Sequence, residues 1–236
     1  MDNPFSGWQR GRRLAVVMAG GRSSRFAGLG MHKSMAAVLG MPVIGHVIDY
    51  WRRYADEFVF VVKNGKEPLR EYVQSLAIDA RFVEPEVLRG IAHGLLAAEP
   101  LVDSPFIMVL GDCYCRGEFR VPPGFARGHA IGVQRGARAE ETRRNYSVEV
   151  EADLVTRVVE KPTDVPNDLC GTGYYFFEPD VFDAIRATPP SPRSNEQEIT
   201  DVLQTLIGAQ GLRALWFDGT YININTPADL AAVEVA

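Results

Sequence analysis

Short apolar runs alternate with amphipathic segments in the first half of the chain. The apolar runs end at glycine or polar residues, which is typical of strands buried on both faces of a parallel sheet. The longer segments place their apolar side chains on one face of a helix. The expected strands cover residues 14–19, 58–62, 81–83 and 106–110, and the expected helices cover residues 43–51, 67–76 and 90–98. This alternation predicts βαβ units in a mainly parallel sheet.

The pattern changes after Asp112. Residues 130–135, 146–150 and 156–159 are short strand-like runs with only turns between them, which predicts a small antiparallel lobe over the carboxyl edge of the sheet. Apolar residues at helical spacing then predict a helix over residues 199–207, followed by a strand over 212–217. Thr226 and Pro227 are typical of a helix start. We therefore expect an α/β fold of three layers around a mixed, mainly parallel sheet.

Length and composition limit the number of domains and the class of protein. A chain of 236 residues with 46% hydrophobic residues has enough apolar surface for one globular core. We expect a polar tail over residues 1–13 and one domain over 14–236, with halves at 14–112 and 113–236. The net charge of -5 argues against a nucleic-acid surface. No apolar run approaches the length of a membrane helix, and three unpaired-looking cysteines favour reduced thiols, so we expect a cytoplasmic protein.

The loop over residues 20–33 (GGRSSRFAGLGMHK) carries the first chemical signal. It follows a predicted strand and combines four glycines with two arginines and a lysine. Glycines let backbone N–H groups approach phosphate oxygens, and the cations offset their charge. The spacing fits neither a Walker A loop nor a dinucleotide fingerprint. From these residues alone, both triphosphate binding and a merely flexible basic loop stay open.

Single polar residues lie at three other predicted strand ends. Asp112 follows the strand 106–110 at the edge where open α/β sheets bind ligands. Asn223 ends a short strand before the last helix, and Glu160 and Lys161 end the strand 156–159. Taken singly, each also has an ordinary structural interpretation as a turn or cap residue, or as a solvated ion pair.

Seven segments together resemble the sugar-1-phosphate nucleotidylyltransferases, which are NDP-sugar pyrophosphorylases of glycosyltransferase-A-like fold within the MobA-like and RmlA-like NTP-transferase superfamily. The segments follow the order in which that family carries them and extend over most of residues 14–230. They are 19–25 (AGGRSSR) with Lys33, 90–94 (GIAHG), 110–112 (LGD), 159–162 (VEKP), 171–174 (GTGY), 198–201 (EITD) and 223–227 (NINTP).

The resemblance implies an enzyme that joins an NTP to a sugar 1-phosphate, or to a related phosphate monoester, and releases pyrophosphate. It assigns catalysis to Arg25, Lys33 and Asp112. It assigns the remaining functions to NTP-binding residues Ala19, Gly20, Gly21, Arg22, Ser23 and Gly90, acceptor-binding residues Glu160, Lys161, Gly171 and Thr172, and Mg²⁺ ligands Asp112 and Asn223. The partners are then an NTP and a phosphorylated small molecule, with no nucleic acid and no membrane, for a monomer or homodimer.

Three departures from the family pattern keep alternatives open. His32 replaces the usual proline before the signature lysine, which should change the stiffness of the loop more than its chemistry. Pro85 stands where pyrimidine-specific members carry a glutamine, so the nucleotide base stays undecided. Asn223 stands where the family often has an aspartate. A molybdenum cofactor guanylyltransferase and a non-catalytic nucleotide-binding regulatory protein remain the alternatives.

Overall fold

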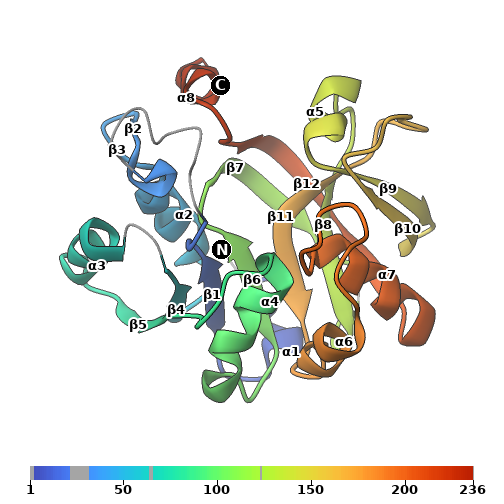
Figure 1. Cartoon of the computed structure of the whole chain (residues 1–236), viewed down its shortest axis with the longest axis horizontal. Coiled ribbons are helices and arrows are strands. Elements are labelled where there is room, and N and C mark those ends of the chain that lie inside the picture. Colours follow the sequence, from blue (N-terminus) through green and yellow to red (C-terminus); the bar gives the residue numbers. More distant parts are fainter. Residues whose placement is uncertain (1–2, 22–31, 64–65, 123, 236) are drawn as a thin grey trace.

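A computed structural model describes residues 3–21, 32–63, 66–122 and 124–235, which form one large mixed sheet between helices (Figure 1). Within these residues the sheet has ten strands, in the order β5-β4-β1-β6-β11-β8-β12-β10-β9, with β7 paired to β12. The strands are β1 (Leu14–Met18), β4 (Glu57–Val61), β5 (Asp79–Val83), β6 (Phe106–Leu110), β7 (Cys113–Arg120), β8 (His129–Gln134), β9 (Tyr146–Glu151), β10 (Leu154–Glu160), β11 (Cys170–Phe177) and β12 (Leu212–Asn223). A separate hairpin pairs β2 (Ala37–Val38) with β3 (Met41–Pro42).

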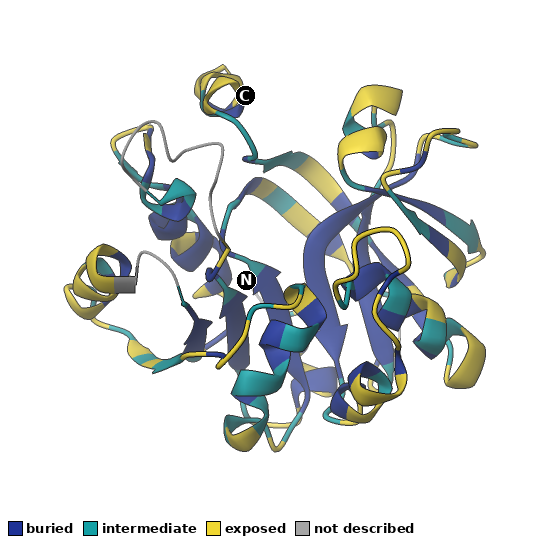
Figure 2. Ribbon diagram, in the orientation of Figure 1, coloured by how far each residue is buried: buried dark blue, intermediate teal, exposed yellow. Residues whose placement is uncertain are grey.

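Helices cover both faces of this sheet. One face packs against α1 (Ser6–Gln9), α2 (Val43–Trp51) and α3 (Lys66–Gln74), and the other against α4 (Ile91–Leu95), α6 (Val181–Ala187) and α7 (Ile199–Ala209). The remaining helices are α5 (Ala139–Arg144), α8 (Pro227–Glu234) and the 3₁₀ turns η2 (Lys33–Met35) and η3 (Leu96–Leu101). The inner strands are buried and the outward helix faces are exposed (Figure 2). The three-layer α/β fold is therefore confirmed.

The parallel half of the sheet creates the edge on which the site is built. Leu14 of β1 lies opposite Glu57 of β4 on one side and Phe106 of β6 on the other, both in parallel register. The connection after β1 runs over one face through α2, whereas the connection into β6 runs over the other through α4. The carboxyl ends of β1 and β6 thus lie side by side at a topological switch point, where open α/β sheets bind ligands.

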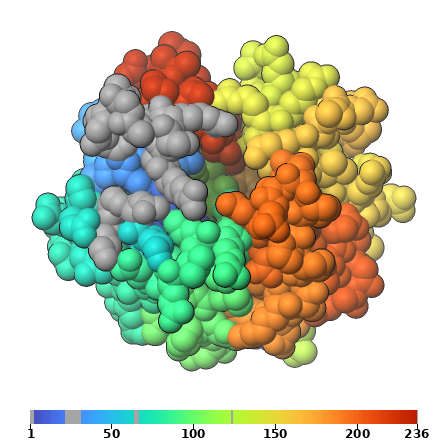
Figure 3. Space-filling view, in the orientation of Figure 1, coloured from blue at the N-terminus to red at the C-terminus, as the bar shows by residue number. Residues whose placement is uncertain are grey.

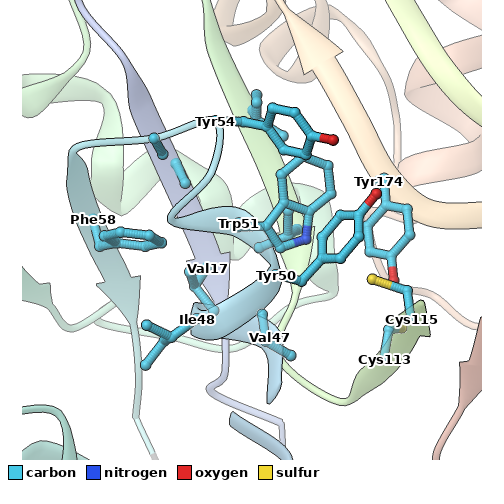
Figure 4. Close-up of a cluster of buried hydrophobic side chains, with 14 of the residues drawn as sticks. Val17, Val47, Ile48, Tyr50, Trp51, Tyr54, Phe58, Cys113, Cys115 and Tyr174 are labelled. Carbon is cyan, nitrogen blue, oxygen red and sulfur yellow. The ribbon is translucent and has the colours of Figure 1, made fainter. Parts of the chain in front are cut away.

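An aromatic cluster anchors α2 to the sheet (Figure 4). The ring of Trp51 is fully buried, and its centroid lies 5.0 Å from that of Tyr174 and 5.8 Å from that of Tyr54. The thiol of Cys115 is buried in the same cluster, and burial raises its pKa to about 12. These contacts join the first half of the chain to β11 of the second half.

Residues 3–13 differ from the polar tail that we expected. Phe5 and Trp8 are fully buried against the aromatic face of the sheet, and the indole N–H of Trp8 donates to the carbonyl of Gly128 at 3.0 Å. The arginines of this segment are ion-paired, as Arg12 is with Glu57 at 2.9 Å. Because Phe5 and Trp8 are fully buried, α1 belongs to the core.

The antiparallel strands of the second half continue the main sheet. β9 and β10 form a hairpin at its edge, β11 pairs with both β6 and β8, and β12 is antiparallel to β7 over eight residue pairs. We did not expect β7, β11, α5 or α6 from the sequence. The predicted lobe is therefore the edge of one sheet, with α5 above it.

The helix predictions hold at most positions. α7 and α8 begin at or next to the expected residues, and the backbone N–H of Thr226 donates to the Asp229 carboxylate at 2.7 Å, which caps α8. The segment expected as one helix over 90–98 is divided, because α4 ends at Leu95 and continues as the 3₁₀ turn η3, which contains Pro100. Over the described part of the chain, every helix is too short or too polar to span a bilayer.

Candidate active site

The end of β1 forms the floor of the first cavity. The cavity has a volume of 320 Å³ and is lined by Ala19, Gly20, Gly21, Lys33 and Gly90 together with apolar side chains. Gly20 is closely packed, since a Cβ there would lie 3.1 Å from the backbone nitrogen of Lys63. Arg22, Ser23 and Arg25 lie outside the described residues, so their predicted roles stay predictions.

His32 fixes the other end of this loop. Its Nε2 lies 2.9 Å from the carbonyl oxygen of Gly21, which can only accept, so the ring donates there and accepts the backbone N–H of Ser34 at Nδ1. Burial lowers the pKa of His32, which favours this neutral form. The ring therefore ties the glycine pair to the turn that begins at Lys33.

Lys33 and Asp112 form an ion pair at the switch point. Asp112 follows β6, whose end is tied to that of β1 because the N–H of Gly111 donates to the carbonyl of Met18 at 2.9 Å. Only 20% of the Lys33 side chain and 13% of the Asp112 side chain are exposed. The two predicted catalytic residues are thus in direct contact, although 79 residues of sequence separate them.

Gly90 begins α4 at the rim of the same cavity. Its φ of +101° is in the region that favours glycine, and a Cβ would lie 2.3 Å from the carbonyl oxygen of Gln197. The N–H of Gln197 in turn donates to the carbonyl of Arg89 at 2.7 Å. The segment before α7 therefore closes against the start of α4, and only glycine fits between them.

A second cavity of 590 Å³ extends from Asp112 into the other half of the chain. Its lining includes all four residues predicted to bind the acceptor: Glu160, Lys161, Gly171 and Thr172. In the space-filling view a hollow separates the cyan and green segments from the yellow and orange ones (Figure 3). The two cavities share Lys33, Asp112, Leu110 and Ile91, so they meet at the ion pair.

Lys161 and Glu160 line this second cavity side by side in the sequence. The Lys161 ammonium lies 3.3 Å from the Glu160 carboxylate, and its backbone has a φ of +45°, which is rare for a residue with a side chain. A hydrogen bond of 2.7 Å from its N–H to the carbonyl of Asn145 holds this conformation. Burial raises the pKa of Glu160 although Lys161 is adjacent and acts in the opposite direction.

Gly171 and Thr172 contribute backbone atoms more than side-chain atoms to the second cavity. A Cβ on Gly171 would collide with the ring of Tyr146, whose hydroxyl donates to the carbonyl of Thr172 at 3.0 Å. The Thr172 hydroxyl donates to the carbonyl of Gly132 at 3.1 Å. Its side chain is therefore engaged in β11–β8 packing.

Several polar residues of the cavity carried no motif in the sequence. Arg193 lies next to the cavity and not in its wall: it is ion-paired with Glu198 and lies 3.8 Å from the carboxylate of Glu160, which lines the cavity. Such residues on the cavity wall itself are Arg143, Arg144, Asn145, Tyr146 and Tyr221. Arg143, Arg144 and Asn145 belong to the unexpected helix α5 or directly follow it, whereas Tyr146 and Tyr221 lie in strands that the sequence did predict.

Asp112 and Asn223 fit a site for a hard divalent cation. Asn223 is opposite Cys113 in the β12–β7 register, and the N–H of the following Ile224 donates to the carbonyl of Asp112 at 2.9 Å. The Oδ1 of Asn223 is buried and has no hydrogen-bond partner among the described residues. One carboxylate oxygen and one amide oxygen are donors of the kind that Mg²⁺ takes. The described residues of the chain contain no cluster of three His, Cys, Asp or Glu side chains that could hold a metal ion.

The sequence profile of the nucleotidyl transferase family matches residues 14–222. The chain belongs to this family. The matched range includes Lys33, Asp112, Glu160 and Lys161, and it ends one residue before Asn223. The resemblance found in the short motifs is therefore confirmed.

Individual members of the nucleotidyl transferase family are similar over nearly the whole chain. UTP–glucose-1-phosphate uridylyltransferase AglF of Haloferax volcanii is 29% identical over 93% of this chain and 94% of its own length. The glucose-1-phosphate thymidylyltransferase of Streptomyces antibioticus is 29% identical over 93% of this chain, which spans 65% of that protein. The bifunctional protein GlmU of Methanocaldococcus jannaschii is 24% identical, and the chain spans 52% of it.

Solved structures share the fold. A UDP-glucose pyrophosphorylase complexed with UDP-glucose superposes with a TM-score of 0.81 at 20% identity, covering 95% of this chain and 97% of the other. The inositol-1-phosphate CTP transferase from T. maritima gives a TM-score of 0.79 at 21% identity, covering 97% and 96%. The switch-point geometry of this nucleotidyl transferase thus belongs to a fold found in enzymes named for different bases and acceptors.

Proposed function

We propose that this nucleotidyl transferase joins the nucleotidyl group of an NTP to the phosphate of a sugar 1-phosphate and releases pyrophosphate. The observation that carries the proposal is the meeting of two cavities at the Lys33–Asp112 pair. One cavity has the glycine-lined floor that suits a triphosphate, and the other has a lysine and a carboxylate that suit a phosphate and hydroxyl groups. The names of AglF and the thymidylyltransferase point to the same substrate class.

The reaction joins two anions. An oxygen of the acceptor phosphate attacks the α-phosphorus, a new P–O bond forms, and the bond to the β-phosphate breaks so that pyrophosphate leaves. No general base is needed, because the attacking oxygen is already ionised at pH 7. Catalysis then rests on alignment of the reactants and on stabilisation of the charge that builds at the α-phosphoryl group.

Each predicted site residue has a role in this scheme. The backbone of Gly20 and Gly21 holds the triphosphate, together with Arg25, Arg22 and Ser23 of the loop. Lys33 stabilises the α-phosphoryl group, and Lys161 holds the acceptor phosphate while Glu160 accepts hydrogen bonds from acceptor hydroxyls. Asp112 and Asn223 would hold Mg²⁺, which supplies Lewis-acid neutralisation of phosphate charge when bound. A cytoplasmic location and a monomeric or homodimeric state remain predictions.

A pyrophosphate-release assay tests the proposal. The chain is incubated with Mg²⁺, each of ATP, GTP, CTP, UTP and dTTP, and a panel of sugar 1-phosphates. Stoichiometric pyrophosphate and an NDP-sugar are the expected products. Turnover with GTP and molybdopterin alone would favour the molybdenum cofactor alternative, and tight NTP binding without turnover on any acceptor would favour the regulatory one.

A further inference from the structure

Asn145 ends α5 directly above the site, and all of its polar groups are engaged. Its backbone N–H donates to the carbonyl of Glu141 at 3.2 Å, and its backbone carbonyl accepts the N–H of Lys161 at 2.7 Å. Its side-chain Nδ2 donates to the same Glu141 carbonyl at 3.0 Å. Its Oδ1 accepts a hydrogen bond of 2.8 Å from Nδ2 of Asn223. One residue therefore contacts both the acceptor lysine and an expected metal ligand.

These bonds decide which way each amide faces. The Glu141 carbonyl can only accept, so Asn145 must present its NH₂ group to it and its oxygen to Asn223. Asn223 must then present its own NH₂ group to Asn145. If the Asn223 amide were rotated by half a turn, two acceptor oxygens would face each other. The network therefore turns the buried Oδ1 of Asn223, which has no hydrogen-bond partner in the described part of the chain, away from Asn145.

We propose that Asn145 is a positioning residue, which locks the Asn223 amide so that its oxygen, and not its NH₂ group, serves the metal. This inference rests on the metal assignment in the proposed function. An aspartate at position 223 would need no such lock, because both of its oxygens are acceptors. An asparagine does need one, because its NH₂ group would repel a cation. The hydrogen bond from Asn223 to Asn145 thus fixes the amide orientation that an asparagine at position 223 requires.

The test measures metal binding directly. Mn²⁺ alone is titrated with the intact chain, and the free ion is followed by its electron paramagnetic resonance signal. Removal of an outer partner of a metal ligand typically weakens metal affinity by about 10-fold or more, so we expect that loss for Asn145→Ala. Asn145→Asp keeps an acceptor for Asn223 and should bind Mn²⁺ at least as tightly as the wild type.

A second background separates positioning from a general structural effect. In Asn223→Asp the lock is unnecessary, so Asn145→Ala should change Mn²⁺ affinity by no more than about twofold there. Asn167→Ala is the matched control, because Asn167 does not line the two cavities. Its Nδ2 donates to the carbonyl of Val148 at 3.0 Å, and its Oδ1 accepts the backbone N–H of Leu169 at 2.9 Å. Asn167→Ala should leave Mn²⁺ affinity unchanged.

The steady-state kinetics provide an independent readout. Asn145→Ala keeps the backbone bond to Lys161, so it should raise the Mg²⁺ concentration needed for half-maximal turnover while leaving the acceptor KM near its wild-type value. Equal loss of Mn²⁺ affinity in both position-223 backgrounds, or loss in Asn145→Asp as large as in Asn145→Ala, would overturn the positioning role. If Asn223→Ala binds Mn²⁺ like the wild type, the metal assignment itself is refuted, whereas absent pyrophosphate release in the wild type would refute the reaction.

Discussion

Replacing Lys33 with alanine should reduce the rate of chemistry far more than the stability of the fold. In the structure the ammonium is paired with Asp112 at the junction of the two cavities. During transfer we expect it to stabilise the charge that grows on the α-phosphoryl group. Loss of one preorganised donor of this kind lowers kcat by about 10²–10³, or about 2.7–4 kcal/mol.

The stability effect of the same change should be much smaller. Fully exposed ion pairs contribute about 0–1 kcal/mol, and breaking a fully buried pair costs about 3–5 kcal/mol. Lys33 and Asp112 are 20% and 13% exposed at the edge of open cavities, so water can solvate the carboxylate that remains. We therefore expect a loss near about 1 kcal/mol, or about 2–4 °C in Tm.

The assay combines pyrophosphate release at saturating substrates with thermal unfolding of the same samples. Lys161→Ala is the informative comparison, because it should raise the acceptor KM more than it lowers kcat. Arg186→Ala serves as the charge-removal control, since Arg186 pairs with Glu99 away from both cavities. A Lys33→Ala enzyme whose kcat stays within about tenfold of the wild type would refute the role given to this lysine.

Four further predictions follow from other residues. In a Mg²⁺ titration of activity at fixed NTP, Asp112→Ala should show no turnover, whereas Asn223→Asp should retain turnover and bind the metal more tightly. Retained activity in Asp112→Ala would place the metal elsewhere. Burial raises the pKa of Glu160, so this carboxylate should become protonated at a higher pH than an exposed glutamate does, and the acceptor KM should rise as the pH falls through that range. The substrate phosphate titrates equally in the wild type and in Glu160→Gln, so the variant should lack only the part of the KM change that comes from Glu160. The ionised form is the destabilised one, so Glu160→Gln should also raise the free energy of unfolding at neutral pH, as denaturant titration would show. Trp8→Ala should cost about 3–5 kcal/mol in urea unfolding, and a loss below about 1 kcal/mol would mean that α1 is not part of the core. With Pro85 in place of glutamine, we expect either a purine preference or a relaxed preference among NTPs in kcat/KM, and a preference for UTP or dTTP above about 100-fold would contradict this.

The elements that the sequence predicted are those that a residue pattern within one segment identifies. β1, β4 and β6 are continuous apolar runs, and α7 and α8 carry helical spacing and a capping sequence. Such signals lie within one segment, so they can be found without knowing the fold. Asp112 could be placed at the sheet edge for the same reason, because a strand end defines its position.

The elements that the sequence did not predict depend on distant partners. β11 is buried at all eight residues, so it lacks the alternation that marks a strand with one exposed face, and its two glycines suggest a loop. β7 is polar and includes Gly117, whose close approach to Asp218 of β12 is visible only when the strands are paired. α1 has only four residues. Asn145 lies at the end of an unexpected helix, so nothing in the sequence linked it to Asn223.

The site is built where these two kinds of element meet. The parallel half supplies the glycine pair and Asp112, and the antiparallel half supplies Lys161 and Asn223. The seam between the halves is tightly packed, because a Cβ on Gly173 of β11 would lie 2.9 Å from the thiol of Cys113, and the hydroxyl of Tyr221 accepts the N–H of Gly173 at 2.8 Å. Tightly packed groups transmit displacement rather than absorb it. The relative position of the two cavities is therefore set by this seam, which no single motif of the sequence contains.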